Sequence, residues 1–316
     1  MRRVVKWLAG AATVGMFLVL VMGATVTNTG SAQGCGQDWP LCNGRFIPEF
    51  AVSTLIEWSH RAVTGVEGLL IVAAAAGAWW FWRRRPEIKV LVPTMLVFLV
   101  LQAALGAWAV KYGQAVEVLA LHFGVSLVAF ASVLLTFLFV LQADGDLDAL
   151  RDRALPAGLR RAGWGLTAYI YVVVYLGAYV RHTDTMLACR DWPLCNGAVF
   201  PGFSGAVGIV FAHRLAAGLG VLALGWLTWR AWRLRAARPD LWVAAAVSFA
   251  LILLQALSGA IVVWTAVGLF SALLHSALVA LLFGALTYFC LQSLPRPSAA
   301  CVPAVPQYAA APSRAG

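Results

Sequence analysis

Charged residues are scarce in this sequence of 316 residues. Only 11% of them are Asp, Glu, Lys or Arg, whereas 62% are hydrophobic. A soluble globular domain carries about 25% charged residues, so this composition excludes an ordinary soluble protein. The polar segments are short and separate many apolar runs that are long enough to cross a bilayer. The sequence therefore belongs to the class of polytopic membrane proteins.

The net charge of +10 does not indicate a nucleic-acid partner. The 23 Lys and Arg residues lie in short clusters between apolar runs, which is how basic residues mark membrane topology. No basic domain that could hold a duplex is present, so we expect the lipid bilayer as a partner and no nucleic acid. Cysteine is also rare, since six residues are too few for a disulfide scaffold.

Eight apolar runs are long enough to span a membrane as helices, which takes about 20 residues each. The runs are continuously apolar rather than alternating, and lipid admits only helices or closed barrels, so helices are predicted. The expected fold class is an all-α polytopic membrane protein. The predicted spans are residues 6–26, 52–82, 90–110, 116–141, 162–181, 207–230, 241–265 and 269–292.

An even number of spans places both termini on the same side of the membrane. If that side is the cytoplasm, 17 of the 23 Lys and Arg residues lie inside. Because inner segments are enriched in these residues, both termini are predicted to be cytoplasmic and the cysteine-containing loops to lie on the outer face. The predicted location is the plasma membrane.

The motif Asp-Trp-Pro-Leu-Cys-Asn-Gly occurs twice, at residues 38–44 and 191–197, an offset of 153 residues. With at most one residue of slippage, the same offset relates Gly23 to Gly177, His60 to His213, Arg61 to Arg214, Gln102 to Gln255, Gly106 to Gly259 and His122 to His275. A duplication explains this pattern. It predicts two tandem four-helix bundles related by a pseudo-two-fold axis near the membrane normal. It also makes the first span a structural helix rather than a signal peptide, because that span matches the fifth.

The repeat divides the chain into an N-terminal half, residues 1–141, and a C-terminal half, residues 162–292. A cytoplasmic linker, residues 142–161, is predicted between them. Residues 293–316 are rich in Pro and Ala and are predicted to form a disordered cytoplasmic tail.

Four of the five histidines lie within predicted spans, at similar depth in the outer third of the membrane. Ionisable residues in spans are costly and usually face a bundle interior with a partner. No third ligand at this depth completes a structural zinc site, whereas haem needs at most two axial ligands. The pattern favours two haem sites over histidines that only bond to a neighbouring helix. The two pairs are His60 with His122 and His213 with His275.

Arg61 and Arg214 each follow a histidine near the outer surface. Each guanidinium could bind a haem propionate through charge-assisted hydrogen bonds, or could be a snorkelling side chain at the interface. His182 has no counterpart in the repeat and is expected to be a solvated histidine of the second outer loop.

Glu57 breaks the symmetry of the repeat. It precedes His60 by three residues and so lies on the same helix face, whereas Val210 occupies its position in the second half. A carboxylate beside one histidine pair suggests that one haem is acted upon and the other is held. The alternative is a carboxylate favoured by the helix dipole near an N-terminus. Glu67 is also unmatched, opposite Gly220, and no role is predicted for it.

Two cysteines lie in each outer loop, Cys35 and Cys42 in the first and Cys189 and Cys195 in the second. The outer side of a membrane is oxidising, so a structural disulfide in each loop is one interpretation. The other is a redox-active pair that passes electrons, or exchanges thiols, with a haem below it.

Taken together, these features resemble the haem A synthase family, in its cysteine-bearing, Bacillus-like subgroup. The resemblance covers residues 1–292. It is carried by the eight spans in two halves, the four paired histidines, the cysteine loops and the segment Glu57-Trp58-Ser59-His60-Arg61. It implies an oxidoreductase that oxidises the C8 methyl group of haem O to a formyl group. Successive hydroxylations would give haem A for terminal oxidases.

The resemblance also assigns roles in the first half. Glu57 matches the family's important carboxylate and is the catalytic candidate. The substrate haem O would be received near His60, His122 and Arg61. Cys35 and Cys42 match the cysteine pair of the subgroup, for which a role in haem or electron handling is suspected.

In the second half, the resemblance makes His213 and His275 the axial ligands of a haem b cofactor, with Arg214 as a propionate candidate. The cysteines of that loop, Cys189 and Cys195, are one residue closer together than those of the first. The resemblance further implies haem O synthase and oxidase-assembly proteins as partners. An electron donor is also implied, and the sequence does not identify it.

A dihaem b-type electron carrier, or quinone-linked cytochrome, is the main alternative. It predicts two chemically unchanged haems and gives no reason for Glu57 to occur in one half only. A transporter built from parallel repeats is a further alternative, but it leaves the histidine pairs without a role.

Overall fold

The computed structural model describes residues 1–143, 150–151, 153 and 155–295. These residues form eight helices, each long and apolar enough to cross a membrane. The chain is therefore a multi-pass α-helical membrane protein, because a helix satisfies its own backbone hydrogen bonds in lipid. The helices are α1 (Arg2–Asn28), α2 (Val52–Trp82), α3 (Pro86–Tyr112), α4 (Val116–Gln142), α5 (Ala157–His182), α6 (Gly205–Trp232), α7 (Pro239–Trp264) and α8 (Leu269–Ser293).

The predicted spans are confirmed to within a few residues, and the differences have local causes. Helices α3 and α7 begin at Pro86 and Pro239, earlier than predicted, because proline suits the first turn, where its missing N–H is not needed. The predicted linker 142–161 is too long, since residues 157–161 form the first turn of α5. The rest of the linker includes positions outside the described residues, which are 144–149, 152 and 154, and so does the predicted tail from 296 onward.

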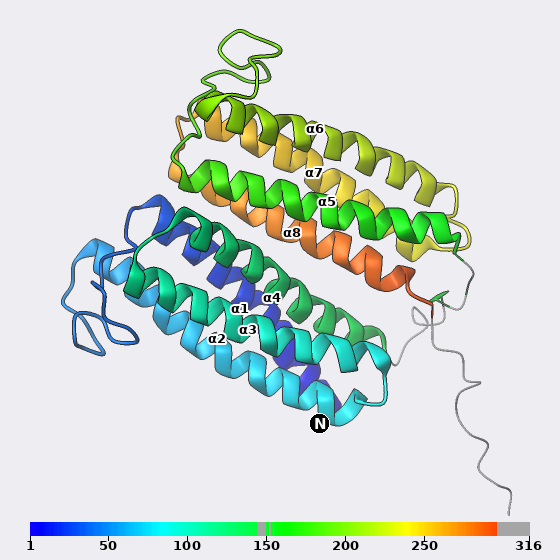
Figure 1. Cartoon of the computed structure of the whole chain (residues 1–316). Helices are drawn as coiled ribbons and strands as arrows, with labels where there is room; N and C mark the ends of the chain where they lie inside the picture. The colour runs from blue at the N-terminus through cyan, green and yellow to red at the C-terminus, as the bar shows by residue number, and fades with distance from the viewer. Residues whose placement is uncertain (144–149, 152, 154, 296–316) are drawn as a thin grey trace, which may run out of the picture.

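Helices α1–α4 and α5–α8 form two four-helix bundles that lie side by side (Figure 1). The main contacts between the bundles are α1 with α8, α4 with α5, and α4 with α8. A two-fold rotation would exchange α1 with α5 and α4 with α8. It would turn the α1–α8 contact into the α5–α4 contact and leave the α4–α8 contact in place, so the contacts have the symmetry of a two-fold interface. The tandem pseudo-two-fold arrangement predicted from the repeat is therefore present in the fold.

Helix α4 lies at the centre of this arrangement. In the most apolar segment of α4, 72% of the residues are buried. The corresponding share in each of the other helices is 44% or less. Close packing with α8 is possible because Gly284 has no side chain: a Cβ there would lie 2.6 Å from Leu134 Cδ2. Small residues that let helices approach are the usual basis of helix association in membranes, where the hydrophobic effect between helices is weak.

Polar side chains join the two bundles at both ends of the interface. At one end, Arg181 of α5 donates through Nε to Asn28 Oδ1 of α1, at 3.1 Å. At the other, Gln142 of α4 donates to the hydroxyl of Tyr288 at 2.7 Å and accepts from the amide of Gln292 at 2.6 Å. These contacts hold the bundles in one register, while apolar side chains fill the space between them.

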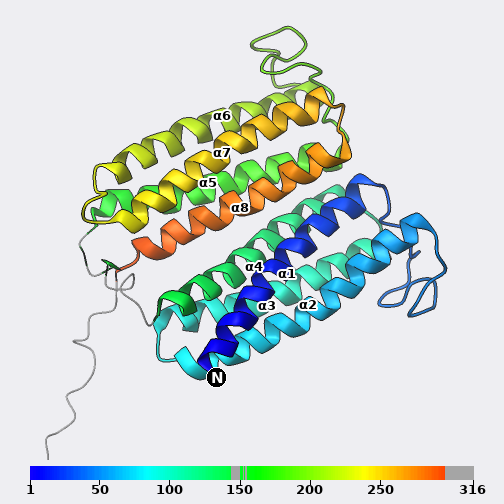
Figure 2. The same cartoon turned by 180° about the vertical axis from the view of Figure 1, so that it is seen from behind.

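The two long loops, residues 29–51 and 183–204, emerge at the same end of the molecule. The N-terminus and the end of α8 lie at the opposite end, as Figure 2 shows from behind. Both cysteine motifs therefore cover the same end of the bundles, each above its own half.

Candidate functional site

The four paired histidines occupy equivalent positions in their helices. His60 and His213 each lie eight residues after the first residue of α2 and α6. His122 and His275 each lie six residues after the first residue of α4 and α8. His60 lies close enough to His122 for the charges of the two rings to interact, and the same is true of His275 and His213. The structure thus brings together the two pairs predicted from the sequence, one in each bundle.

Each of these rings lies against a glycine of the neighbouring helix. A Cβ on Gly23 of α1 would lie 3.3 Å from His60 Nε2, and a Cβ on Gly177 of α5 would lie 2.8 Å from His213 Cε1. Helices α3 and α7 repeat the contact: a Cβ on Gly106 would lie 3.5 Å from His122 Cε1, and one on Gly259 3.3 Å from His275 Cε1. The glycines leave the space that the imidazoles occupy.

The rings differ in their hydrogen bonds. His275 is the one of the four whose two ring nitrogens have partners among the described residues: Ser258 Oγ at 2.8 Å from Nδ1, and Gln255 Nε2 at 3.1 Å from Nε2. The Nδ1 atoms of His122 and His213 are buried with no hydrogen-bond partner. A buried imidazole nitrogen without a partner is costly, and coordination of a metal through the ring is one way to use it.

The donor set suits an iron porphyrin better than a bare metal ion. No group of three or more His, Cys, Asp or Glu side chains is placed to hold a metal in the part of the chain that the structure describes. Each half offers two imidazoles, which is the number of axial positions that a haem iron has. The number of imidazoles in each half therefore suits the axial positions of one haem.

The repeated motif folds into the same loop in both halves. The Asn-Gly pair of the first loop has positive φ at both residues, 50° at Asn43 and 77° at Gly44. This is the two-residue turn that Asn-Gly favours, and the backbones of Cys42 and Arg45 exchange two hydrogen bonds across it. Asn196 and Gly197 repeat this conformation in the second loop.

Each loop is closed by a disulfide, Cys35–Cys42 in the first half and Cys189–Cys195 in the second. All four cysteines are at most 2% exposed, although the loops themselves are largely exposed. The disulfides therefore lie on the inner side of each loop, toward the helices.

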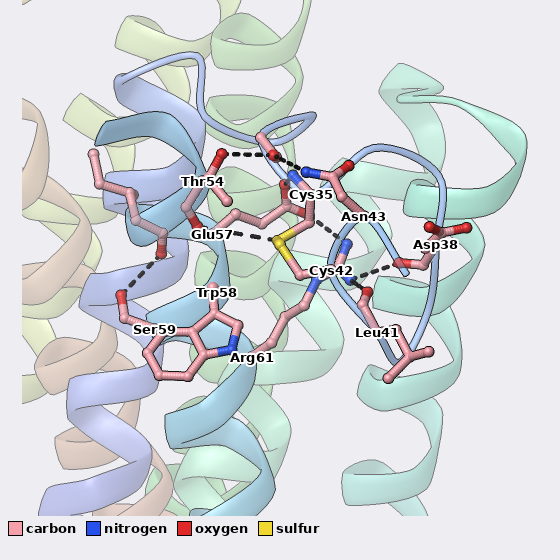
Figure 3. Close-up of a disulfide and its surroundings, with 12 residues drawn as sticks. Cys35, Asp38, Leu41, Cys42, Asn43, Thr54, Glu57, Trp58, Ser59 and Arg61 are labelled. Atoms are coloured by element: carbon pink, nitrogen blue, oxygen red, sulfur yellow. Dashed lines mark hydrogen bonds and ion pairs between the residues drawn. A yellow bond between two sulfur atoms is a disulfide. The ribbon is translucent and has the colours of Figure 1, made fainter. Parts of the chain in front are cut away.

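Glu57 connects the first disulfide loop to α2 (Figure 3). Glu57 is 3% exposed, and both of its carboxylate oxygens are engaged. The backbone N–H of Cys35 donates to Oε2 at 2.8 Å, and Arg61 Nη2 donates to Oε1 at 2.6 Å. A buried side chain that accepts two such bonds is held in place.

Arg61 and Arg214 both bind the loop above them. Arg61 Nη1 donates to the carbonyl oxygens of Asp38 and Leu41, each at 2.6 Å. Arg214 donates to three loop carbonyls, those of Asp191, Leu194 and Cys189, at 2.6–3.0 Å. Neither residue is a freely snorkelling side chain, because the guanidinium clamps the cysteine loop to the helix.

The second loop has its own carboxylate, in a different place. Backbone N–H groups of Gly197 and Asn196 donate to Asp191, and these bonds lower the pKa of its carboxyl. Because the pKa in the folded state is lowered, this support for the loop is present above the ordinary pKa of Asp and is lost as the pH falls through the lowered value. Val210, at the position of Glu57, is buried and apolar.

His182 is not the solvated loop histidine that the sequence predicts. It is the last residue of α5, is half-buried, and lies within electrostatic range of His122. The prediction was wrong because α5 extends to the junction between the halves, where Arg181 binds Asn28 of α1.

Glu67 occupies a second position at which the halves differ. Its carboxylate is buried, Oε1 has no hydrogen-bond partner, and the group fills the space that a Cβ on Gly15 would need. In the second half the large and small residues are exchanged: Tyr169 stands in place of Gly15 and Gly220 in place of Glu67, with the Tyr169 ring 3.6 Å from a Cβ on Gly220. The first half therefore has a polar group in its interior where the second has an aromatic ring.

Sequence reasoning missed Ser258 and the function of the four glycines. The glycines were visible as repeat-equivalent positions, but their contact with the histidines needs the helix pairing. Ser258 was visible only as a mismatch with Leu105, one of many between the halves.

Comparisons with known proteins identify the family of this chain. A family model described as "Cytochrome oxidase assembly protein" (COX15-CtaA) matches residues 6–287. A protein of Geobacillus kaustophilus (strain HTA426) named "Heme A synthase" is 40% identical over 295 residues, which is 93% of each chain. A protein of the same name from Bacillus cereus (strain AH187) is 40% identical over 292 residues, 91% of this chain and 93% of the relative.

The contacts of Glu57 predict that it protects the first disulfide. Glu57→Gln removes the charge that holds Cys35 N–H and Arg61, and a hydrogen bond to a charged group contributes about 1.5–3 kcal/mol. We expect Cys35–Cys42 to be reduced by a water-soluble phosphine about tenfold faster in this variant, since about 1.4 kcal/mol corresponds to tenfold. Alkylation and mass spectrometry would follow both disulfides in one sample.

The second loop is the internal control, because Val210 replaces the glutamate there and Cys189–Cys195 should react at an unchanged rate. Glu49→Gln, which removes an exposed ion pair with Arg45 in the first loop, is the matched variant and should have no effect. Equal reduction rates of Cys35–Cys42 in Glu57→Gln and the unsubstituted protein would contradict the assignment.

Proposed function

Because the chain belongs to the COX15-CtaA family of cytochrome oxidase assembly proteins, we propose that it is a haem A synthase. The reaction is the oxidation of the C8 methyl group of haem O to a formyl group through successive hydroxylations. This conversion removes four electrons from the substrate and adds one oxygen atom. The observation that carries the proposal is the duplicated histidine pair, each ring lying against a glycine, in a chain 40% identical to proteins named "Heme A synthase".

We propose that the second half, residues 162–292, holds haem b between His213 and His275. The support is the donor set and the glycines that make room for both rings. A bound haem b supplies one-electron transfer, and the protein supplies its position and surroundings. Val210, which is buried and apolar, stands here in place of the carboxylate found in the first half.

The first half, residues 1–141, receives haem O at His60 and His122 in this proposal. Glu57 is the catalytic candidate because it is buried, lies one helical turn from His60, and has no counterpart in the second half. Arg61 and Cys35 N–H hold its two oxygens in place, so it is a fixed acidic side chain next to the proposed substrate site. Preorganised polar groups of this kind stabilise charge that develops during a reaction.

The propionate role of Arg61 and Arg214 would use the donors that the loops leave over. Each guanidinium has five N–H groups. Arg61 uses three of them, for two loop carbonyls and Glu57, and Arg214 uses three for loop carbonyls. Nε and one Nη2 proton remain for an anionic group beside the histidine. The cysteine loop and a propionate would then share one arginine.

The proposed setting is the plasma membrane, with both termini in the cytoplasm and the cysteine loops outside. The partners in this proposal are haem O synthase, which would supply the substrate, and proteins of oxidase assembly, which would take the product. The support for the orientation is the distribution of Lys and Arg between the two ends of the bundles.

Haem extracts test the activity directly. Cells that make haem O would be compared with and without this protein, and the haems of the purified protein separated by chromatography. We expect haem A only when the protein is present. In Glu57→Ala we expect haem A to be lost and haem b to remain, because the substitution affects the first half alone.

Glu49→Ala is the matched control, since it removes an exposed glutamate of the same loop and should leave haem A unchanged. Two haem b groups per chain, with no haem O or haem A under any condition, would contradict the proposal. That result would favour the dihaem electron carrier.

The orientation is tested by cysteine labelling of intact cells with a membrane-impermeant maleimide. Glu49→Cys in the first loop should be labelled, whereas Arg84→Cys between α2 and α3 should not; both positions are exposed. Four of the six native cysteines form disulfides and Cys290 is buried, and Cys301, which lies outside the described residues, is replaced by serine in both variants. Labelling of Arg84→Cys alone would place the loops on the cytoplasmic side.

The glycine contacts predict the result of adding a single methyl group. Gly177→Ala places a Cβ 2.8 Å from His213 Cε1, so the ring or the helix must move. A ligand site must be held to within about 0.5 Å, and we expect about tenfold weaker retention of haem b, measured per chain after purification. Gly165→Ala on the same helix meets no atom within 4 Å and is the control. Equal haem b in both variants would contradict the packing argument.

A further inference from the structure

The side chain of Ser258 on α7 holds one of the four histidines in a defined orientation. Its hydroxyl donates to the carbonyl oxygen of Gln255, one turn earlier, at 2.9 Å, and lies 2.8 Å from His275 Nδ1. A hydroxyl has one proton, so a serine that donates to a carbonyl must accept from the ring. The arrangement therefore favours the tautomer with hydrogen on Nδ1, which leaves Nε2 as the basic nitrogen.

The amide of Gln255 agrees with this assignment. Its Nε2 lies 3.1 Å from His275 Nε2 and donates to the lone pair of that nitrogen. The same helix thus binds both nitrogens of the ring, and Ser258 is 2% exposed, so water does not compete for its hydroxyl. A metal would bind Nε2 in place of the Gln255 amide.

The first half has the same glutamine and the same glycine but not the serine. Gln102 and Gly106 are the counterparts of Gln255 and Gly259, whereas Leu105 stands where Ser258 would be. The carbonyl of Gln102 faces the His122 ring, yet His122 Nδ1 has no hydrogen-bond partner in the described residues. The carbonyl of Gln255 faces His275 in the same way, so the two rings differ in the hydroxyl alone: a leucine cannot bridge the ring and the carbonyl as Ser258 does.

We propose that this difference sets how long each half keeps its haem: Ser258 anchors His275 for a permanent cofactor, and Leu105 leaves His122 as a weaker ligand that can release the product. The inference rests on the proposed function, in which the second half holds haem b and the first half turns over haem O. Ser258 is a positioning residue, because it acts through His275.

The physical basis is the second shell of a metal site. A ligating histidine usually donates its other N–H to an acceptor, which fixes the ring and raises its basicity, and removal of that acceptor costs about 10- to 100-fold in metal affinity. A cofactor must remain bound through many turnovers, whereas a product must leave. In two halves of the same fold, a serine in one of them is sufficient for that half to retain its haem while the other releases its product.

The test measures haem release rather than activity. The full-length protein, purified in detergent from cells that make haem O, would be mixed with excess apomyoglobin as the haem acceptor. Haem b and haem O or haem A are chemically distinct, so chromatography at successive times gives the release rate from each half in one sample. In the unsubstituted protein, haem b should leave more slowly than haem O or haem A.

Ser258→Ala should speed the release of haem b by about 10- to 100-fold and leave the release of haem O and haem A unchanged. Ser248→Ala is the matched control, because Ser248 is a buried serine of the same helix whose hydroxyl donates to the carbonyl of Ala244, away from the histidines. Leu105→Ser should slow the release of haem O and haem A from the first half.

Equal haem b release from Ser258→Ala, Ser248→Ala and the unsubstituted protein would overturn the role of Ser258. Unchanged haem O and haem A release from Leu105→Ser would overturn the role of Leu105. His275→Ala separates these outcomes from a failure of the proposed function. If that variant retains haem b fully, the ligand assignment is wrong, whatever Ser258 does.

Discussion

The close contact between a glycine on one helix and a histidine on the next is the constraint on which this structure depends. An imidazole inside a membrane bundle needs both space and a partner, and tightly packed helices offer neither unless a residue without a side chain faces it. Gly23, Gly106, Gly177 and Gly259 provide that space four times. The contact fixes the register of α1 with α2 and α3 with α4, and of their counterparts in the second half. The positions of the cysteine loops are set in turn by the ends of the helices that they connect.

Duplication turns one such bundle into two, and a few substitutions give the halves different properties. Glu57 links the first loop to α2, while the buried Val210 at the equivalent position of α6 is apolar. The first half has Glu67 packed against Gly15, where the second half has Gly220 and Tyr169. Leu105 of the first half corresponds to Ser258 of the second. Each change lies on a helix that carries a histidine or packs against one. In the proposed function, these changes let one scaffold bind two similar planar groups and treat them differently, without any change in backbone arrangement.

Much of this architecture could be predicted from the sequence, because hydropathy and repeats act at the level of whole helices. The eight spans, the two halves and the pairing of histidines all follow from apolar runs and one offset. Contacts of single side chains could not be predicted in the same way. The sequence placed Glu57 near His60 but not its bonds to Cys35 N–H and Arg61, since those depend on how the loop folds back. His182 was misplaced because a helix end in the interface between halves resembles a loop in sequence.

The central claim is that the two histidine pairs, although equivalent in geometry, do different work. It is tested most directly by counting haem b per chain in cells unable to make haem O, for the double variants His60→Ala/His122→Ala and His213→Ala/His275→Ala. The account predicts that the first double variant keeps the haem b of the unsubstituted protein and that the second loses it. Equal loss from both, or retention by both, would contradict the division of labour between the halves.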